Sequence, residues 1–360
     1  MTKVLLLSLV FLIFLYTIQL IFNSPRGLPL NSPNTLTLPD STPWPNLTLN
    51  TIFSTNHSWT QKLNPGQTVT LIATGDIILA RVTNLIAVQK NDFSWAFKKI
   101  AETLKGADIT FINLETPLMQ NCKPTNEGMT FCGDVRHLQG LLSAGVDVVS
   151  LANNHAGNYG PTPVEDTKKL LEQNHIAVTG ISGPNIKEVK GVKFAFLGYN
   201  DIGKFAGVSQ ADETKICSEI KDVKPKVDVV IVQYHWGVEY RSQPDESQKS
   251  LGHLTIDCGA DLVIGNHPHW IQPVEFYHDK LITYALGNTI FDQEWSQKTK
   301  EGVIGRYLFF NKKLVDVEYL PLLIQNYGQP SFLGGVAKQK ILDEMKNQSE
   351  ILATASTAKN

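Results

Sequence analysis

Neither sign of charge dominates the sequence. It contains 32 lysines and arginines against 34 aspartates and glutamates, a formal net charge of −2, and no run of basic residues stands out. Proteins that bind nucleic acid need a concentrated basic surface to contact the phosphate backbone. The composition therefore gives no reason to expect a nucleic-acid partner.

Cysteine is scarce, and its spacing excludes one class of metal site. The four cysteines are Cys122, Cys132, Cys217 and Cys258, so the chain lacks the Cys-x-x-Cys pairs that hold structural zinc. Cys122 and Cys132 enclose a short polar segment, which predicts a loop-closing disulfide in an exported protein. Cys217 and Cys258 are either a second pair or two free buried thiols.

Long apolar runs are also rare, and only the N-terminus has one. Val4–Phe22 carries no charged residue and is long enough to cross a bilayer as a helix. A cleaved signal peptide usually has a shorter apolar core and small residues at the cut, and Gln19–Pro25 offers no such site. We therefore predict that residues 1–22 are an uncleaved membrane anchor of a single-pass cell-membrane protein, with the rest of the chain extracytoplasmic.

Composition divides the remaining chain into three parts. Residues 23–66 are rich in Pro, Asn, Ser and Thr without a sustained period, which predicts a linker. Residues 67–335 alternate short apolar runs with helical patterns, such as Trp95–Leu104 and Gln248–Asp257, which is typical of an α/β domain. Residues 336–360 are predicted to form a helix-prone, polar tail.

Five apolar runs in this domain end in polar residues. The runs and their ends are Val69–Ala73 before Asp76, Ala107–Ile112 before Glu115, Val146–Leu151 before Asn153-Asn154-His155, Val227–Val232 before His235, and Leu262–Ile264 before His267-Pro268-His269. Short apolar runs fit central strands that are buried on both faces. Sites in open α/β sheets form beyond the carboxyl ends of the strands, so these five ends are predicted to meet in one site.

The chemistry of these ends indicates a metal site. His267 and His269 would project from the same side of an extended segment, and imidazole is the commonest side-chain metal ligand. Asp76, Glu115, Asn154 and His235 complete a mixed set that suits Zn, Mn or Fe(II) better than Ca or Mg. Such a set exceeds the needs of one tetrahedral ion, so one or two divalent ions are expected. Asn153 competes with Asn154 as the amide ligand, and His155 is a further candidate for a role in the site.

The same residues lie in blocks that resemble the CapA family, which is named for capsule and poly-γ-glutamate biosynthesis and is similar to calcineurin-like metallophosphoesterases. The blocks are Ala73–Asp76, Asn113–Pro117, Ser150–His155, His235–Tyr240, Gly265–His269 and Tyr284–Asn288, in order between Val69 and Gln293. The resemblance implies a two-sheet sandwich flanked by helices, a four-layer αββα arrangement, with metals at the loop ends.

The resemblance also implies a role for each residue. Asp76 and His269 would hold a first metal, Glu115 would bridge, and Asn154, His235 and His267 would hold a second, while His155 would act as general acid or contact the transition state. The neighbouring residues expected to support these ligands are Asn113, Asn153, Glu239 and Asn288. Metallophosphoesterases usually place a histidine two residues after the first aspartate, where this chain has Ile78. The first metal is therefore one ligand short.

Three functions remain open at this point. One is a metal-dependent hydrolase or transferase that acts on, or helps export, an anionic cell-envelope polymer such as poly-γ-glutamate. Another is a metal-dependent phosphoesterase, against which Ile78 counts. The last is a non-enzymatic accessory subunit that works with membrane polymer-synthase subunits. A shared scaffold cannot separate them, because function depends on the site rather than on the fold.

Overall fold

The structure is a computed structural model that describes residues 44–357 of the 360-residue chain. The predicted anchor, and the predicted linker as far as residue 43, lie outside the described residues. From Pro45 onward the chain forms one compact unit. Between residues 44 and 357, no helix is long and apolar enough to cross a membrane.

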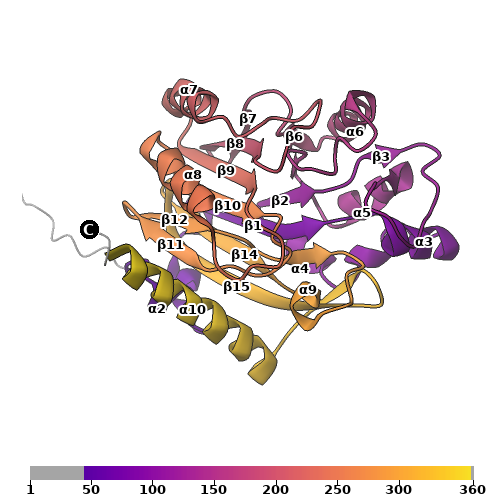
Figure 1. The fold of residues 1–360 in the computed structure, drawn as a ribbon. Helices are drawn as coiled ribbons and strands as arrows, with labels where there is room; N and C mark the ends of the chain where they lie inside the picture. Colours follow the sequence, from indigo (N-terminus) through magenta and orange to yellow (C-terminus); the bar gives the residue numbers. More distant parts are fainter. Residues whose placement is uncertain (1–43, 358–360) are drawn as a thin grey trace, which may run out of the picture. The chain divides into compact units, whose positions relative to one another are not determined.

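The larger of two mixed sheets has eight strands (Figure 1). Its strands are β1 (Thr68–Ile77), β2 (Ile109–Leu114), β5 (Val148–Ser150), β6 (Ala177–Thr179), β13 (Asn288–Ile290), β14 (Glu301–Phe310), β15 (Lys313–Gln325) and β16 (Gln329–Phe332). They lie in the order β16-β15-β14-β1-β2-β5-β6, and β13 pairs with the end of β1. Strands β1, β2 and β5 are parallel, so their carboxyl ends lie at one edge.

The smaller sheet has six strands in the order β11-β12-β10-β9-β8-β7. They are β7 (Asn185–Val189), β8 (Val192–Asn200), β9 (Val229–His235), β10 (Leu262–Asn266), β11 (Val274–Tyr277) and β12 (Lys280–Thr283). Strands β8, β9 and β10 are parallel. A separate pair joins β3 (Leu118–Met119) to β4 (Gly133–Asp134).

Helices surround the two sheets. The α-helices are α2 (Leu49–Ile52), α3 (Arg81–Lys90), α4 (Ala101–Lys105), α5 (Leu138–Ser143), α6 (Pro161–Gln173), α7 (Glu213–Val223), α8 (Glu246–Asp257), α9 (Gln297–Lys300) and α10 (Gly335–Thr357). Short 3-10 turns cover Ser58–Lys62, Pro65–Gln67, Trp95–Phe97, Val135–His137 and Lys224–Lys226. Asp245 caps the start of α8 in a capping box with Gln248, which is why this helix begins two residues before the predicted stretch.

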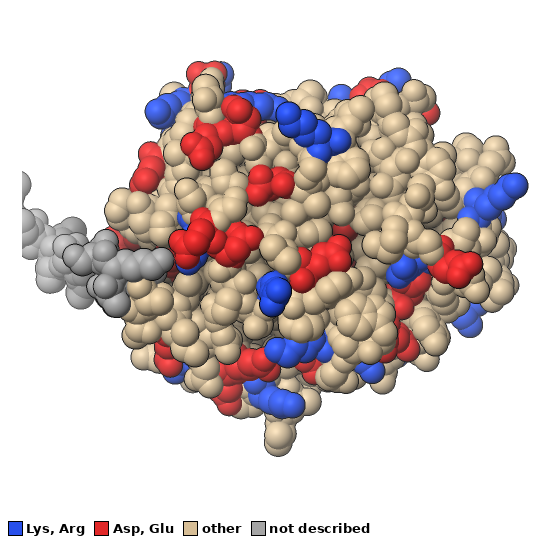
Figure 2. Space-filling view, viewed as in Figure 1, with Lys and Arg blue, Asp and Glu red and all other residues tan. Residues whose placement is uncertain are grey.

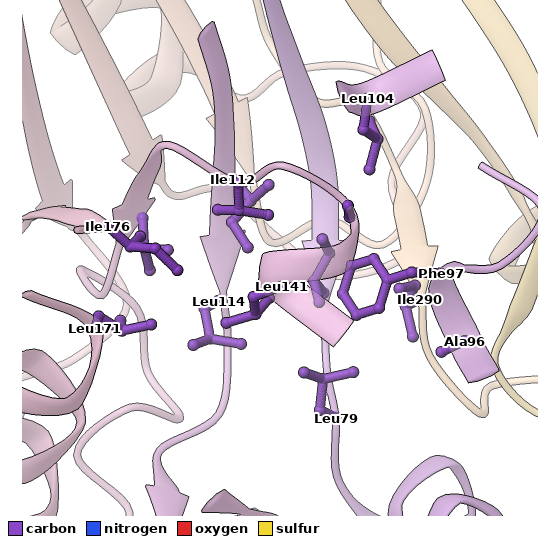
Figure 3. Packing of buried hydrophobic residues seen from close by; sticks show 14 of the residues in the cluster. Leu79, Ala96, Phe97, Leu104, Ile112, Leu114, Leu141, Leu171, Ile176 and Ile290 are labelled. Carbon is purple, nitrogen blue, oxygen red and sulfur yellow. The ribbon is translucent and has the colours of Figure 1, made fainter. Parts of the chain in front are cut away.

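Three buried clusters show how these elements are layered. Between the sheets, Phe111 of β2 meets Phe196 of β8 edge-on at a centroid distance of 5.0 Å. The next residue of β2, Ile112, points the other way and packs with Leu141 of α5 and Leu171 of α6 (Figure 3). A third cluster joins the outer face of the smaller sheet to α7 and α8. Each fully buried side chain of this size contributes about 1.5–3 kcal/mol.

Both ends of the described chain are more ordered than the composition suggested. From Pro45 to residue 66, where we expected linker, Ile52 and Phe53 are buried, and Phe53 stacks on Tyr319 of β15. The expected polar tail is the 23-residue helix α10, which buries Ile341, Leu342, Met345 and Leu352. In each case a few apolar residues within a polar stretch are enough to dock it on the sheets.

All four cysteines form disulfides. Cys122 is bonded to Cys132, which closes the loop between β3 and β4. Cys217 of α7 is bonded to Cys258, which follows α8. The second bond ties together the two helices that cover the smaller sheet, and it decides between the two alternatives that the sequence left open.

Candidate metal centre

The polar ends of strands from both sheets converge on one site. Asp76 lies in β1, Glu115 follows β2 and Asn154 follows β5, all in the larger sheet. His235 ends β9, and the His267–His269 segment follows β10, in the smaller sheet. All of these except the half-buried Asn154 are buried. The two sheets thus meet at a shared edge, where each contributes half of the polar groups.

Four donor atoms crowd together at this edge. His235 Nε2 lies 2.9 Å from Asn154 Oδ1, 3.1 Å from His267 Nδ1 and 3.3 Å from Glu115 Oε1. Ligands bound to a tetrahedral zinc at about 2.0–2.1 Å stand roughly 3.3 Å apart, because that is the edge of the tetrahedron. The spacing of these atoms is therefore that of a ligand set around one cation.

Glu115 is the least satisfied polar group in the site. Its side chain is fully buried, and neither carboxylate oxygen has a hydrogen-bond partner among the described residues. A buried carboxylate without partners is expensive, since it has lost its water without gaining hydrogen bonds. Burial and the neighbouring Asp76 carboxylate raise the pKa of Glu115 well above its usual value. A cation beside Glu115 would remove this cost, so the residues present fit a metal.

Asp76 and His269 form a second group of donors around the same glutamate. Ligand atoms of Asp76, Glu115 and His269 lie within 4.8 Å of one another, as do those of Glu115, His235 and His267. His269 Nδ1 lies 3.0 Å from Asp76 Oδ2 and 2.9 Å from Asn288 Oδ1. The carboxylate common to both groups is Glu115, which matches the bridging position implied by the resemblance.

Burial and hydrogen bonds set the charge states in this region. Burial lowers the pKa of His235 to about 3 and, with the nearby His235, lowers that of His267 well below its usual value. Burial alone would lower the pKa of His269 too, but its hydrogen bond with Asp76 raises it to about 9. The Asp76 pKa stays below its usual range because His269 outweighs the effect of burial. His235 and His267 are thus neutral imidazoles, the form that binds metals.

The His-Pro-His segment differs in conformation from the extended one that we predicted. Strand β10 stops at Asn266, and both His267 and His269 have a left-handed backbone, with φ of 98° and 57°. Such a conformation costs about 1–3 kcal/mol per non-glycine residue and is common at functional sites. The turn sends the two rings to different groups, His267 toward His235 and His269 toward Asp76.

The structure separates the two candidate asparagines. Asn153 donates to Asn113 Oδ1 and to the Leu114 carbonyl, and its own Oδ1 accepts from the backbone of His155 and Ala156. Its amide is therefore fully engaged in holding the loop. Asn154 instead directs Oδ1 at His235, which leaves it as the candidate ligand. Asn113 supports the site by donating to Asp76 Oδ1.

His155 lies beside the donor groups rather than among them. Its Nε2 is 3.9 Å from Glu115 Oε1. Its Nδ1 lies 2.9 Å from Asn158 Oδ1, which also accepts from the backbone N–H of Phe131, so Nδ1 carries the proton. Burial lowers the pKa of His155 to about 4. The neutral ring therefore presents an unprotonated Nε2 toward the site, where it can exchange a proton with a reacting group.

Two groups near the site were missed by the sequence reasoning. Asn158 orients His155, and its position three residues after that histidine in a glycine-containing turn was the available signal. Arg81, five residues after Asp76, forms an ion pair with Asp292 and lies over the rings of Phe131 and Phe291. Since Phe131 stacks on His155 at 4.0 Å, Arg81 stands behind the candidate catalytic residue.

Residues 70–293 match the family described as "Bacterial capsule synthesis protein PGA_cap". The chain belongs to this family. It is 31% identical over 252 residues to "PGA biosynthesis protein CapA" of Bacillus subtilis (strain 168), covering 65% of this chain and 66% of that protein. It is 27% identical over 308 residues to "Capsule biosynthesis protein CapA" of Bacillus anthracis, covering 79% and 74%. The resemblance stated from the sequence blocks is thereby confirmed, and the matched range contains the whole candidate metal centre of this PGA_cap protein.

Solved structures are similar to this chain only at a low level. A structure titled as a novel phosphatase from Mycoplasma pneumoniae is 13% identical with a TM-score of 0.46, covering 71% of this chain and 94% of that chain. One titled as a putative 5'-nucleotidase from Staphylococcus aureus is 14% identical with a TM-score of 0.47, covering 78% and 58%. Similarity at this level says nothing about a substrate.

Proposed function

We propose that this PGA_cap-family chain is a membrane-anchored, extracytoplasmic enzyme that uses one or two divalent ions to hydrolyse or transfer a bond in an anionic envelope polymer such as poly-γ-glutamate. The observation that carries the proposal is the buried, unpartnered Glu115 with His235 and His267 around it. The polymer class comes from the family and from the names of its relatives.

The electrostatics of the surface support a metal as the recognition element. On the face shown in Figure 2, acidic and basic side chains are interspersed among neutral ones, in keeping with the net charge of −2. A polyanion would find no extended basic patch on that face of the described chain. Positive charge for a substrate carboxylate would come from cations held at the strand ends.

The residues of the site have distinct tasks in this proposal. His235, His267 and Asn154 would hold one ion, Asp76 and His269 another, and Glu115 would contact both. Bound divalent ions would polarise the scissile carbonyl or phosphoryl group and lower the pKa of water. His155, oriented through Asn158, would exchange a proton with the reacting group at Nε2.

The proposed location depends on the N-terminal segment and the cysteines. Val4–Phe22 is uncharged and long enough to span a bilayer. Both cysteine pairs are bonded, and disulfides persist in oxidising compartments outside the cytoplasm. Fractionation of cells that produce the full-length chain tests this, since recovery in the soluble cytoplasmic fraction would contradict it.

The metal content of the full-length protein is the decisive test of the function. We expect at least one tightly bound Zn, Mn or Fe ion per chain after dialysis, measured by elemental analysis. His235→Ala should lose the bound ion. The control variant His175→Ala, at an exposed position just after α6, should keep the ion. A metal-free wild-type protein would overturn the proposal.

Activity assays then separate the candidate reactions. With Mn or Zn present, we expect turnover of a γ-glutamyl polymer that is lost in His155→Ala and His235→Ala. Turnover of a phosphodiester alone would favour a phosphoesterase instead. Loss of capsule on gene deletion, restored by the inactive site variants, would favour an accessory subunit without catalysis.

A further inference from the structure

The metal group around Asp76 lacks a ligand where related sites would have one. Ile78, two residues after Asp76, packs into an apolar cluster with Ala80, Phe131 and Phe291. It is fully buried there and offers no donor atom. Asp76, Glu115 and His269 alone would leave an ion at this position with only three ligands from the described residues.

A carboxylate from the loop after β9 approaches His269, one of the three residues of this group. A ligand atom of Glu239 lies within 4.8 Å of ligand atoms of both His267 and His269. Glu239 is half-buried, unlike the fully buried Asp76 and Glu115, so it reaches the site from the solvent side. Among the described residues, no lysine, arginine or histidine forms an ion pair with Glu239, whose carboxylate hydrogen-bonds with the Tyr240 side chain. Its negative charge is therefore not neutralised by a charged side chain of the protein.

Backbone geometry holds Glu239 in this position. The loop after β9 turns at Gly237, whose φ of 84° favours glycine, and a Cβ there would lie 2.4 Å from the side chain of Gln248. Three residues after Gly237, the Tyr240 N–H donates to the Pro268 carbonyl at 2.8 Å. This bond ties the Glu239 loop to the centre of the His-Pro-His segment.

Charge balance also favours a role in binding. Asp76, Glu115 and Glu239 are three carboxylates gathered around two neutral imidazoles and His269. Buried or half-buried carboxylates in such a group are stable only when they are paired with cations. Two divalent ions bring four positive charges, which exceed the negative charges of the carboxylates. A third carboxylate therefore reduces the net positive charge of the site and does not make the site negative.

We propose that Glu239 is a ligand of the first metal position, in place of the histidine that metallophosphoesterases usually have at the position of Ile78. This inference rests on the proposed metal centre and adds a direct ligand to it. Because Glu239 faces solvent, the ion that it holds would be the one nearer to an incoming substrate. Glu239 would therefore be the ligand most able to shift when a substrate carboxylate or phosphate binds.

Cobalt(II) titration of the full-length protein tests this assignment. We expect the wild type to bind two ions per chain. Binding is measured by elemental analysis and by the visible absorption of bound cobalt. Glu239→Gln should keep one ion and bind the second at least about 100-fold more weakly, because even residues that only orient a ligand cost 10–100-fold in affinity. Glu239→His should restore the second ion by supplying a new donor.

The controls separate the two proposals. Glu172→Gln, at an exposed position of α6, should bind both ions, and thermal unfolding in EDTA should show that Glu239→Gln is folded like the wild type. A wild type that binds no cobalt overturns the metal centre itself. A wild type with a single ion, or a Glu239→Gln variant that keeps two or loses both, overturns only the assignment of Glu239.

Discussion

Replacing Gly75 by alanine should damage the metal centre from inside the sheet. Gly75 precedes Asp76 in β1, and a Cβ added to it would lie 2.0 Å from the carbonyl oxygen of Gly287. Ordinary contact begins at about 3.4 Å, so the two backbones must separate by about 1.4 Å. Gly287 cannot easily adapt, because its φ of 71° already depends on being glycine.

The expected cost has two parts. Overpacking of this kind costs about 1–3 kcal/mol, and loss of the hydrogen bond from Asp76 N–H to the Gly287 carbonyl adds about 1 kcal/mol. A total of about 2–4 kcal/mol corresponds to a fall in melting temperature of roughly 5–10 °C. The shift also exceeds the tolerance of metal–ligand distances, about 0.2 Å, so the ion held by Asp76 should be lost.

Thermal unfolding and metal analysis of the purified variants would check this. Gly334→Ala is the matched control, because an added Cβ there has no atom within 4 Å. The apoproteins should be compared in EDTA, so that lost metal does not enter the stability difference. If Gly75→Ala unfolds within a degree of Gly334→Ala and retains the same metal content, the reasoning about this close approach is wrong.

Two further changes probe parts of the molecule away from the metal centre. Burial would lower the pKa of His57, but its hydrogen bond and ion pair with Asp316 raise that pKa above 6.5. Protonated His57 therefore stabilises the fold below pH 6.5. This contribution is lost as the pH rises through the raised pKa of His57. In urea unfolding, the wild type should have a larger free energy of unfolding than Asp316→Asn, and this difference should be about 1–2 kcal/mol greater at pH 6 than at pH 9. The same difference at both pH values would contradict the pairing. Replacing Cys122 and Cys132 together by serine should cost about 2–3 kcal/mol in the same assay, since the bond closes a short loop; no loss would mean that the reduced loop is already held by its other contacts.

The sequence was informative about the site because its residues follow apolar runs that are buried on both faces. Asp76, Glu115, His235 and His267 stand at the ends of such runs, and a parallel sheet brings those ends together. Glu239, which was expected from the resemblance only as a supporting neighbour, follows β9 by four residues, beyond the turn at Gly237. Local pattern shows where a strand ends, but not where its loop returns.

Parts of the fold were missed for comparable reasons. Strand β7 alternates half-buried and exposed residues at a sheet edge, so its apolar signal is weak. The predicted helix over Trp95–Leu104 is two pieces, Trp95–Phe97 and Ala101–Lys105, although its apolar residues do share one buried cluster. Gly302 lies within the continuous strand β14, where a Cβ would lie only 1.9 Å from the Asn288 carbonyl oxygen. In that case glycine serves close packing rather than flexibility.

The distribution of ligands over two sheets gives the metal centre a mechanical meaning. Asp76, Glu115 and Asn154 belong to one sheet, and His235 and His267 belong to the other. Besides the apolar layer, polar contacts join the sheets at this edge, among them the His269–Asp76 pair at 3.0 Å and the bond from Asn266 Nδ2 to the Thr74 carbonyl at 3.4 Å. An ion bound there would be an inorganic cross-link between halves of the protein that are remote in sequence. The proposed metal centre would then also hold the two sheets together.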